Sequence, residues 1–242
     1  LNPHVSEAYQ VPALRKFVEN SLSNMGLETI DLLQLHCPPP AVYYRPEIFE
    51  LFDQLKREGK IQHMGVSVEK VEEAIKAIEF ENVTTVQIIF NMFRQRPAEL
   101  FFSEAQKKDI GIIVRVPLAS GLLTGTFSAQ TNFESGDHRQ FNRNGEAFDK
   151  GETFSGIDYA TGLAAVEALK EIFPGQPNLA PLALKWILQF DAVSCIIPGA
   201  SNNRQVDSNI SALQIPELTQ EQLAAVQNVY EKYIKKAVHQ LW

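Results

Sequence analysis

The chain has 242 residues, 45% of them hydrophobic, which is enough for one large core. Its formal net charge of -7 provides no basic field for nucleic acid or an anionic membrane, so we expect a small-molecule ligand and neither of those partners. No apolar run reaches the roughly 18 residues of a membrane span, and no signal peptide is recognisable.

Apolar periodicity divides the chain into alternating strands and helices. Short apolar runs bounded by glycine, proline or polar residues indicate buried strands, whereas apolar residues three and four apart indicate amphipathic helices. We expect strands at 30–36, 61–68, 84–91, 110–117 and 192–199. We expect helices at 12–25, 46–58, 69–80, 98–108, 159–173 and 179–190, and a last helix that opens with a capping box at 219–222.

Five apolar strands that alternate with helices predict an α/β fold with a parallel sheet covered on both faces. A doubly wound dinucleotide-binding sheet would carry a Gly-x-Gly-x-x-Gly turn after a strand, and the sequence has none. The other arrangement is a (β/α)8 barrel, here one domain over residues 1–242. Because a barrel has eight units, we expect three βα units, about 80 to 90 residues, to be absent before Leu1.

Polar residues stand near the end of each expected strand. His36 ends the first and Ser67 the second, Gln87 lies in the third, and Arg115 is near the end of the fourth. Each has a structural alternative: a hydrogen-bonded histidine, a serine helix cap, a glutamine that satisfies loop backbone, and an arginine in an ion pair. In a barrel these strand ends share one mouth, and this convergence favours a functional site.

Two further features bear on the site and on the cellular compartment. The stretch "PLASGLLTG", residues 117–125, has small residues whose backbone could approach a phosphate, although such residues also mark ordinary loops. Cys37 and Cys195 lie in apolar runs, which is typical of buried thiols in a reducing cytosol. We therefore expect a cytoplasmic protein.

Five blocks of the sequence resemble the last five strands of the aldo-keto reductases. These blocks are "IDLLQLHCP", "GKIQHMGVS", "VQIIFN", "VPLASGLLTG" and "IIPGASNNRQVDSN", and they occur in the family's order and spacing. "FNRNGEAFDKGETFSGIDYATGL" further resembles a bacterial subgroup known as predicted oxidoreductases. The resemblance implies a (β/α)8 barrel that binds NADP(H), or sometimes NAD(H), across its mouth and reduces an aldehyde or ketone.

The resemblance also implies residue roles. His36 corresponds to the active-site histidine that orients the substrate carbonyl. Ser67 and Gln87 correspond to residues that hold the nicotinamide carboxamide, and Arg115 stands where most members stack an aromatic ring on the nicotinamide. The family's pyrophosphate loop corresponds to residues 118–122, including Leu118, Ser120, Gly121 and Leu122. The adenosine-phosphate site corresponds to residues in the loop after the last strand, namely Gly199, Ala200, Ser201, Gln205, Ser208 and Asn209, with Arg204 beside it.

The sequence departs from the family pattern at several positions. Val68 stands where many members carry asparagine, and basic residues are scarce around Arg204, so both NADP(H) and NAD(H) stay open as cofactors. The family's catalytic group is aspartate, tyrosine, lysine and histidine, and only His36 is assigned. Tyr9, Tyr43 and Tyr44 lie in the wrong segments. We therefore expect turnover from a complete polypeptide and leave it open for residues 1–242 alone.

The polar segment 124–158 is long for a loop in a compact domain, which favours a functional lid over a surface excursion. We expect it to carry Phe141 and Arg143 near substrate or cofactor, and we assign Phe93 to the same region. The leading function is carbonyl reduction. The alternatives are a nicotinamide-sensing regulatory subunit and a metal-dependent hydrolase, and no metal-ligand spacing supports the latter.

Overall fold

The computed structural model describes residues 4–242, and these residues form two compact units. Unit 1 comprises the chain up to Ile88 together with Ser103–Ile112, and unit 2 comprises Ile89–Phe102 and Ile113–Trp242. The expectation of units absent before Leu1 lies outside the described residues.

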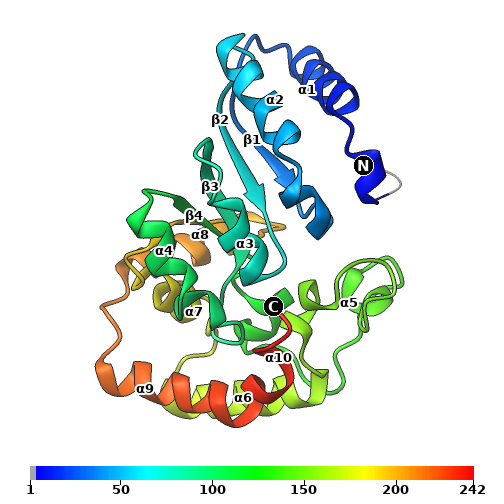
Figure 1. The fold of residues 1–242 in the computed structure, drawn as a ribbon. Helices are drawn as coiled ribbons and strands as arrows, with labels where there is room; N and C mark the ends of the chain where they lie inside the picture. Colours follow the sequence, from blue (N-terminus) through cyan, green and yellow to red (C-terminus); the bar gives the residue numbers. More distant parts are fainter. Residues whose placement is uncertain (1–3) are drawn as a thin grey trace. The chain divides into compact units, whose positions relative to one another are not determined.

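Unit 1 is built on three parallel strands, β1 (Ile30–His36), β2 (Ile61–Ser67) and β3 (Val83–Ile89), in that order. Helices α1 (Val11–Met25) and α2 (Pro46–Arg57) lie side by side beside β1 and β2 (Figure 1). Helix α3 (Val71–Ala77) connects β2 to β3. The side chains of Ile48, Leu51 and Leu55 on α2 are almost completely buried, so this helix covers one face of the strands.

The opposite face of these strands is polar. Alternation along β1 puts Gln34 and His36 on one face and the buried Leu35 on the other. Gly65 on β2 makes room for the Thr85 side chain, because a Cβ at Gly65 would lie 2.1 Å from Thr85 Oγ1. The expectation of strands that are apolar on both faces is therefore wrong for β1, whose residues are mostly half-buried or exposed.

Unit 2 has a helical majority. Strand β4 (Gly111–Arg115) passes into unit 2, where Ile197 N, next to β5 (Val193–Ile196), donates to Val114 O at 2.9 Å. The unit also contains α5 (His138–Phe141), α6 (Tyr159–Ile172), α7 (Ala180–Leu188), α8 (Asn203–Ser211), α9 (Gln220–Val229), a π-helical turn at Tyr230–Ile234 and α10 (Lys235–Val238). Helix α9 runs along α6 (Figure 1), and α4 (Phe101–Lys107) is shared between the units.

Aromatic rings form the core of unit 2 near α7. The Phe90 ring lies 4.7 Å from Phe102, 5.0 Å from Trp186 and 4.9 Å from Phe190. Such contacts combine a large buried area with favourable edge and offset geometry. They fix α7 beside the segment that follows β3.

The structure confirms the expected α/β fold with five parallel strands that alternate with helices. Every expected strand and helix is present, with bounds shifted by a few residues, and Thr219 and Gln222 form the expected capping box. None of the helices in the described residues is both long enough and apolar enough to cross a membrane.

Two expectations about local structure are wrong. Residues 203–211, expected within a loop, form helix α8, because the Asn202 side chain accepts from Gln205 N and caps the first turn. The cysteines are not buried: Cys195 is exposed on β5 and Cys37 is half-buried after β1. An apolar run therefore does not ensure burial when one face of the strand is uncovered.

Candidate cofactor site and active site

Three predicted site residues occupy one level of the strands in unit 1. His36 of β1 is the register partner of Ser67 of β2, and Ser67 is the register partner of Gln87 of β3. Residues in register on parallel strands point to the same face. The structure therefore brings these three side chains into one row, with His36 exposed, Gln87 half-buried and Ser67 completely buried.

Hydrogen bonds link this row to the polar residues beside it. Gln87 Nε2 donates to Gln34 Oε1 at 2.8 Å, and Gln34 Nε2 lies 3.3 Å from Thr85 Oγ1. Ser67 Oγ lies 3.6 Å from Cys37 Sγ. A buried serine and a restrained amide in fixed positions are groups that can bind a carboxamide, which both donates and accepts hydrogen bonds.

Tyr9 and Tyr43 of unit 1 gain no acidity from their surroundings. Burial raises the pKa of Tyr43, and burial together with the nearby Cys37 raises the pKa of Tyr9. Tyr9 Oη lies 3.5 Å from His4 Nδ1, and Tyr44 is exposed. A useful general acid needs a pKa nearer to neutrality, so neither Tyr9 nor Tyr43 is assigned the proton-donor role.

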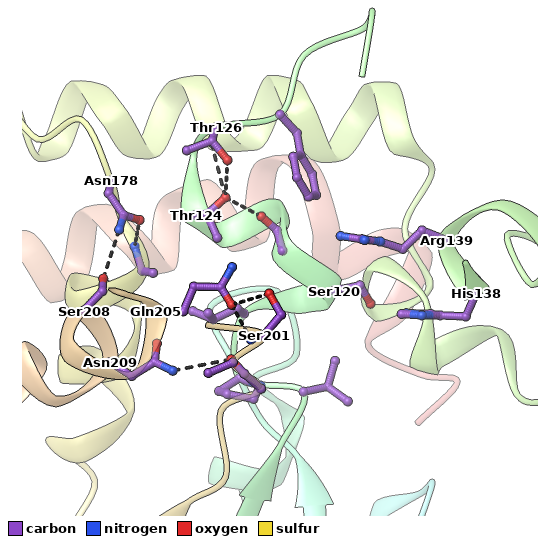
Figure 2. Close-up of a pocket in the computed structure, with 18 of the residues that line it drawn as sticks. Ser120, Thr124, Thr126, His138, Arg139, Asn178, Ser201, Gln205, Ser208 and Asn209 are labelled. Carbon is purple, nitrogen blue, oxygen red and sulfur yellow. Dashed lines mark hydrogen bonds between the residues drawn. The ribbon is translucent and has the colours of Figure 1, made fainter. Parts of the chain in front are cut away.

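Unit 2 contains a cavity of about 1070 Å³ (Figure 2). Much of its lining comes from two segments that are about 80 residues apart in the sequence, the turn after β4 and the start of α8. The predicted cofactor residues among its lining are Leu118, Ser120, Gly121, Gly199, Ala200, Ser201, Arg204, Gln205, Ser208 and Asn209.

The turn after β4 has an unusual backbone. Ala119, Ser120 and Gly121 have φ angles of 47°, 55° and 97°. A Cβ at Gly121 would lie 2.7 Å from the Phe127 ring, so the turn requires a residue without a side chain there. Left-handed turns of small residues let a ligand approach the backbone closely.

The start of α8 forms the other side of the cavity. Asn202 caps the helix, and Gln205 Oε1 accepts from Ser201 N at 2.6 Å and from Ser201 Oγ at 3.1 Å (Figure 2). The first turn of a helix presents backbone N–H groups and the positive end of the helix dipole, which attract anions. Arg204 projects from this turn and lines the cavity.

Segment 124–158 also contributes to this cavity, through Arg139 among others. Arg139 forms an ion pair with Asp137, and this guanidinium lowers the pKa of the Asp137 carboxyl to about 2. The guanidinium also lies 4.6 Å from the centre of the Phe133 ring. Arg139 therefore stands beside the turn at Gly121 as a fixed cation rather than a mobile one.

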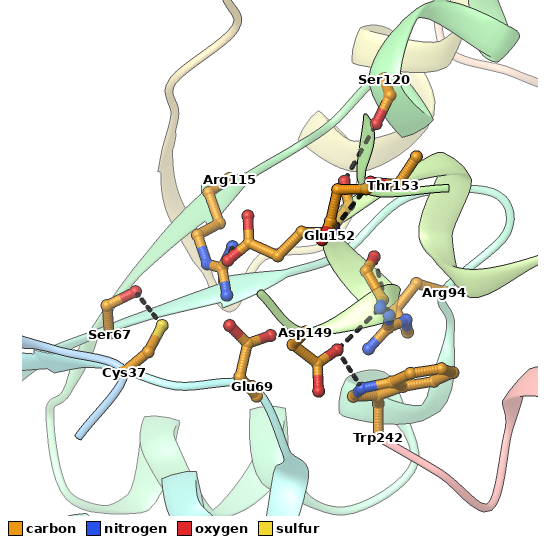
Figure 3. Close-up of polar contacts among 12 residues, drawn as sticks. Cys37, Ser67, Glu69, Arg94, Arg115, Ser120, Asp149, Glu152, Thr153 and Trp242 are labelled. Atoms are coloured by element: carbon orange, nitrogen blue, oxygen red, sulfur yellow. Dashed lines mark hydrogen bonds and ion pairs between the residues drawn. The ribbon is translucent and has the colours of Figure 1, made fainter. Parts of the chain in front are cut away.

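Arg115, at the end of β4, is 5% exposed and pairs with a carboxylate (Figure 3). Its Nη1 lies 2.7 Å from Oε1 of Glu152, which lines the cavity. Ser120 Oγ donates to Glu152 O at 3.0 Å and accepts from Phe154 N at 3.1 Å. These bonds join the turn after β4 to residues 152–154.

Trp242 fixes the same segment from another direction (Figure 3). Its Nε1 donates to Asp149 Oδ1 at 2.7 Å, and the Arg94 guanidinium lies 4.3 Å from the centre of its ring. The ring fills the space that a Cβ would need at Gly151 and Gly156, at 2.7 Å and 2.6 Å. Residues 149–156 are consequently held on two sides.

Other predicted residues lie away from the cavity lining. Leu122 and Phe93 are completely buried. Phe141 is 42% exposed and packs against Phe148, with ring centres 6.1 Å apart. The Arg143 guanidinium lies 5.1 Å from the centre of the Tyr159 ring. None of these four residues is among the lining of the cavity.

Several lining residues of segment 124–158 and one before α7 were not predicted from the sequence. They are Phe127, His138, Arg139, Phe148, Glu152 and Asn178. The signal available for Arg139 and His138 was Asp137, a residue type that caps helices, directly before them. Nothing in the local sequence marked Glu152, because its partner Arg115 lies 37 positions earlier, at the end of β4.

A parallel α/β fold with a cavity formed by a small-residue turn and a helix start is typical of proteins that bind phosphate-containing cofactors. A family model described as "Aldo/keto reductase family" matches residues 2–231 of the chain. The chain belongs to this family. The match covers nearly the whole chain and so gives no support to the expectation that only a C-terminal portion of the family domain is present.

Curated relatives agree with the family. The uncharacterized oxidoreductase YqkF of Bacillus subtilis is 28% identical over 96% of this chain and 69% of its own length. The aldo-keto reductase str7 of Strobilurus tenacellus is 28% identical over 88% of this chain and 61% of its own. The aldo-keto reductase yakc [NADP(+)] of Schizosaccharomyces pombe is 25% identical over 84% of this chain and 58% of its own length. The chain therefore spans about 58 to 69% of these relatives.

Solved structures of the family share the fold. The glycerol dehydrogenase AKR11B4 of Gluconobacter oxydans matches with a TM-score of 0.73 and 26% identity, over 93% of this chain and 66% of that one. The holo form of the aldo-keto reductase AKR11C1 of Bacillus halodurans matches with a TM-score of 0.69 and 25% identity, over 91% and 68%. Family membership establishes an oxidoreductase type of protein at this coarse level.

Proposed function

We propose that the protein reduces an aldehyde or ketone to an alcohol with a nicotinamide cofactor, on a (β/α)8 barrel. The observation that carries the proposal is the cavity of unit 2, where residues 118–121 and 199–209 meet as the family resemblance requires. A small-molecule carbonyl compound is the proposed substrate class, and a cytoplasmic location remains part of the proposal.

The residues of unit 2 fit the phosphates of such a cofactor. The left-handed turn at 119–121 and the first turn of α8 provide backbone approach and a positive dipole end, while Arg204 and Arg139 add positive charge. A pyrophosphate would bind at the turn, and the adenosine phosphate would bind at Arg204. Asn178 and Asn209 add amide groups at the same wall.

From the family resemblance we assign three residues of unit 1 to the nicotinamide carboxamide and to the substrate. Ser67 and Gln87 would hold the carboxamide, and His36 would donate a hydrogen bond to the carbonyl oxygen and fix its orientation. When bound, the reduced cofactor supplies a hydride to the carbonyl carbon. The proton donor of the family is a tyrosine beside a lysine, and no residue of this sequence is assigned to that role.

We propose that NADP(H) is preferred over NAD(H). The support is Arg204 and Arg139 in the cavity lining and the word NADP(+) in the name of one relative. Segment 124–158 is proposed to act as a lid through the residues that line the cavity, His138, Arg139 and Phe148, rather than through Phe141 and Arg143.

Fluorescence titration with NADPH tests this proposal, followed by single-turnover mixing with a reactive aldehyde. We expect saturable binding, and oxidation of the bound cofactor that depends on the aldehyde. Binding without oxidation would favour the alternative, a nicotinamide-sensing regulatory subunit on the same fold. Absence of binding to the complete polypeptide would contradict both.

A further inference from the structure

Glu152 lines the cavity and forms a sheltered ion pair with Arg115. Its carboxylate pairs with Arg115 at 2.7 Å, and the two side chains are only 23% and 7% exposed. Salt screens such a sheltered pair much less than a surface pair. The charge at this part of the cavity therefore depends on both partners together.

The backbone that follows Glu152 has an unusual, left-handed conformation. Phe154, Ser155 and Gly156, which follow it closely, have φ angles of 52°, 58° and 82°. Left-handed backbone at two consecutive residues other than glycine costs free energy and persists only where surrounding contacts impose it. Here Ser155 Oγ bonds to the Asn91 side chain, and the Trp242 ring packs against Gly156.

Both sides of the Glu152 backbone are thus restrained. Ser120 binds residues 152 and 154, and Trp242 binds Asp149, which in turn accepts from Gly151 N at 2.7 Å. A carboxylate in such a segment is held at one place. It can act as a fixed charge without reorganisation when a ligand arrives.

The inference that follows rests on the proposed function, in which the nicotinamide ring lies beside Arg115. The oxidised ring carries a positive charge and the reduced ring is neutral. A guanidinium alone would therefore disfavour the oxidised cofactor and leave the reduced one unaffected. A fixed carboxylate beside the guanidinium offsets this discrimination.

We propose that Glu152 is a specificity-determining residue for the oxidation state of the cofactor. Its carboxylate balances Arg115, so the cavity accepts the oxidised nicotinamide as well as the reduced one. Asp149, Arg94 and Trp242 are positioning residues, because they act on the cofactor only through the segment that carries Glu152.

The test compares the dissociation constants of NADP+ and NADPH for Glu152→Gln, measured by fluorescence titration. Glutamine keeps the size and removes the charge. We expect the constant for NADP+ to rise about five- to tenfold, with a change of less than about twofold for NADPH, given the effective dielectric near a protein surface. Glu146→Gln is the matched control, because Glu146 is an exposed carboxylate of the same segment outside the cavity lining.

The double variant Glu152→Gln with Arg115→Gln sharpens the test. It removes both charges, so the ratio of the two constants should return toward the wild-type value, whereas a packing defect would add to that of the single variant. Thermal melts of both variants establish that they fold. If only the double variant folds, its wild-type-like ratio still supports the proposal and an altered ratio overturns it.

Two outcomes contradict the inference in different ways. Equal weakening of both cofactor forms by Glu152→Gln would show a structural role only, and would leave the proposed function standing. Failure of the wild-type protein to bind either form would overturn the proposed function and this inference with it.

Discussion

The candidate residues of the two units are positioned in different ways. In unit 1, three residues lie in one row because strand register puts them there: His36, Ser67 and Gln87 are successive partners across β1, β2 and β3. In unit 2, the cavity walls come from a strained turn, a helix start and a long connection, and no regular register relates them. The positions of the unit 1 residues follow from period-two alternation along the strands, whereas those of the unit 2 cavity residues depend on particular side chains and glycines.

This difference predicts how each part responds to substitution. A strand row tolerates the loss of one side chain, because its backbone ladder stays intact, and such a change should affect chemistry alone. A loop-built cavity depends on contacts between distant segments, so changes there should affect binding and stability together. The predictions below test this contrast.

The largest expected effect is that of His36→Ala. We expect kcat/KM for carbonyl reduction to fall about 10²-fold or more, because the carbonyl loses its orienting hydrogen bond, while cofactor affinity hardly changes. Steady-state kinetics with an aldehyde series measure this effect. His63→Ala on β2 is the control, and wild-type kinetics for His36→Ala would refute the assignment.

Arg204→Ala should separate the two cofactors. Loss of a charge-assisted hydrogen bond to the 2′-phosphate should weaken NADPH binding by roughly 1.5 to 3 kcal/mol more than NADH binding. Titration with both cofactors measures the difference, and Lys236→Ala on α10 serves as an exposed cationic control. Equal losses for NADPH and NADH would mean that Arg204 has another role.

Gly65→Ala should show how rigid the strand row is. The new Cβ would lie 2.1 Å from Thr85 Oγ1 and 2.8 Å from Thr85 O, so β2 and β3 must separate. We expect a loss of about 1 to 3 kcal/mol in the free energy of unfolding, as in other overpacked sites. Urea denaturation measures it. Gly136→Ala has no atom within 4 Å and should be neutral; similar losses for both would remove the steric explanation.

The smallest expected effect is that of Asp137→Asn at the start of α5. Because Arg139 lowers the pKa of Asp137 to about 2 in the folded state, the ion pair stabilises the protein above the unfolded pKa of 3.8. That contribution is lost as the pH falls toward 2. We expect a deficit of about 1 kcal/mol at pH 7, allowing for partial exposure. Urea midpoints of the two proteins should converge as the pH falls below about 4, and a constant gap would contradict this.

The sequence predicted unit 1 better than unit 2 for a physical reason. The strands at 30–36 and 61–67 were predicted almost to the residue, because apolar runs with proline or glycine boundaries mark strands locally. Helix α8 was missed, because "NNRQVDSN" has little apolar periodicity and its start depends on the Asn202 cap.

The cavity residues show the same limit. Small residues at 118–121 indicated a phosphate loop, because conformational freedom is visible in composition. Glu152 was not predicted, because its ion pair with Arg115 forms only when the chain folds. Phe141 and Arg143 were chosen within segment 124–158, whereas His138 and Arg139 of the short helix α5 are the residues that line the cavity.

The position of Trp242 has a spectroscopic consequence. The chain has two tryptophans, Trp186 in the aromatic core and Trp242 against Gly151 and Gly156, and both belong to unit 2. Indole emission excited at the red edge of the absorption band therefore reports on unit 2 alone, whereas far-ultraviolet circular dichroism reports on the helices of both units. Denaturation curves from the two signals would coincide if the units unfold cooperatively and separate if they do not.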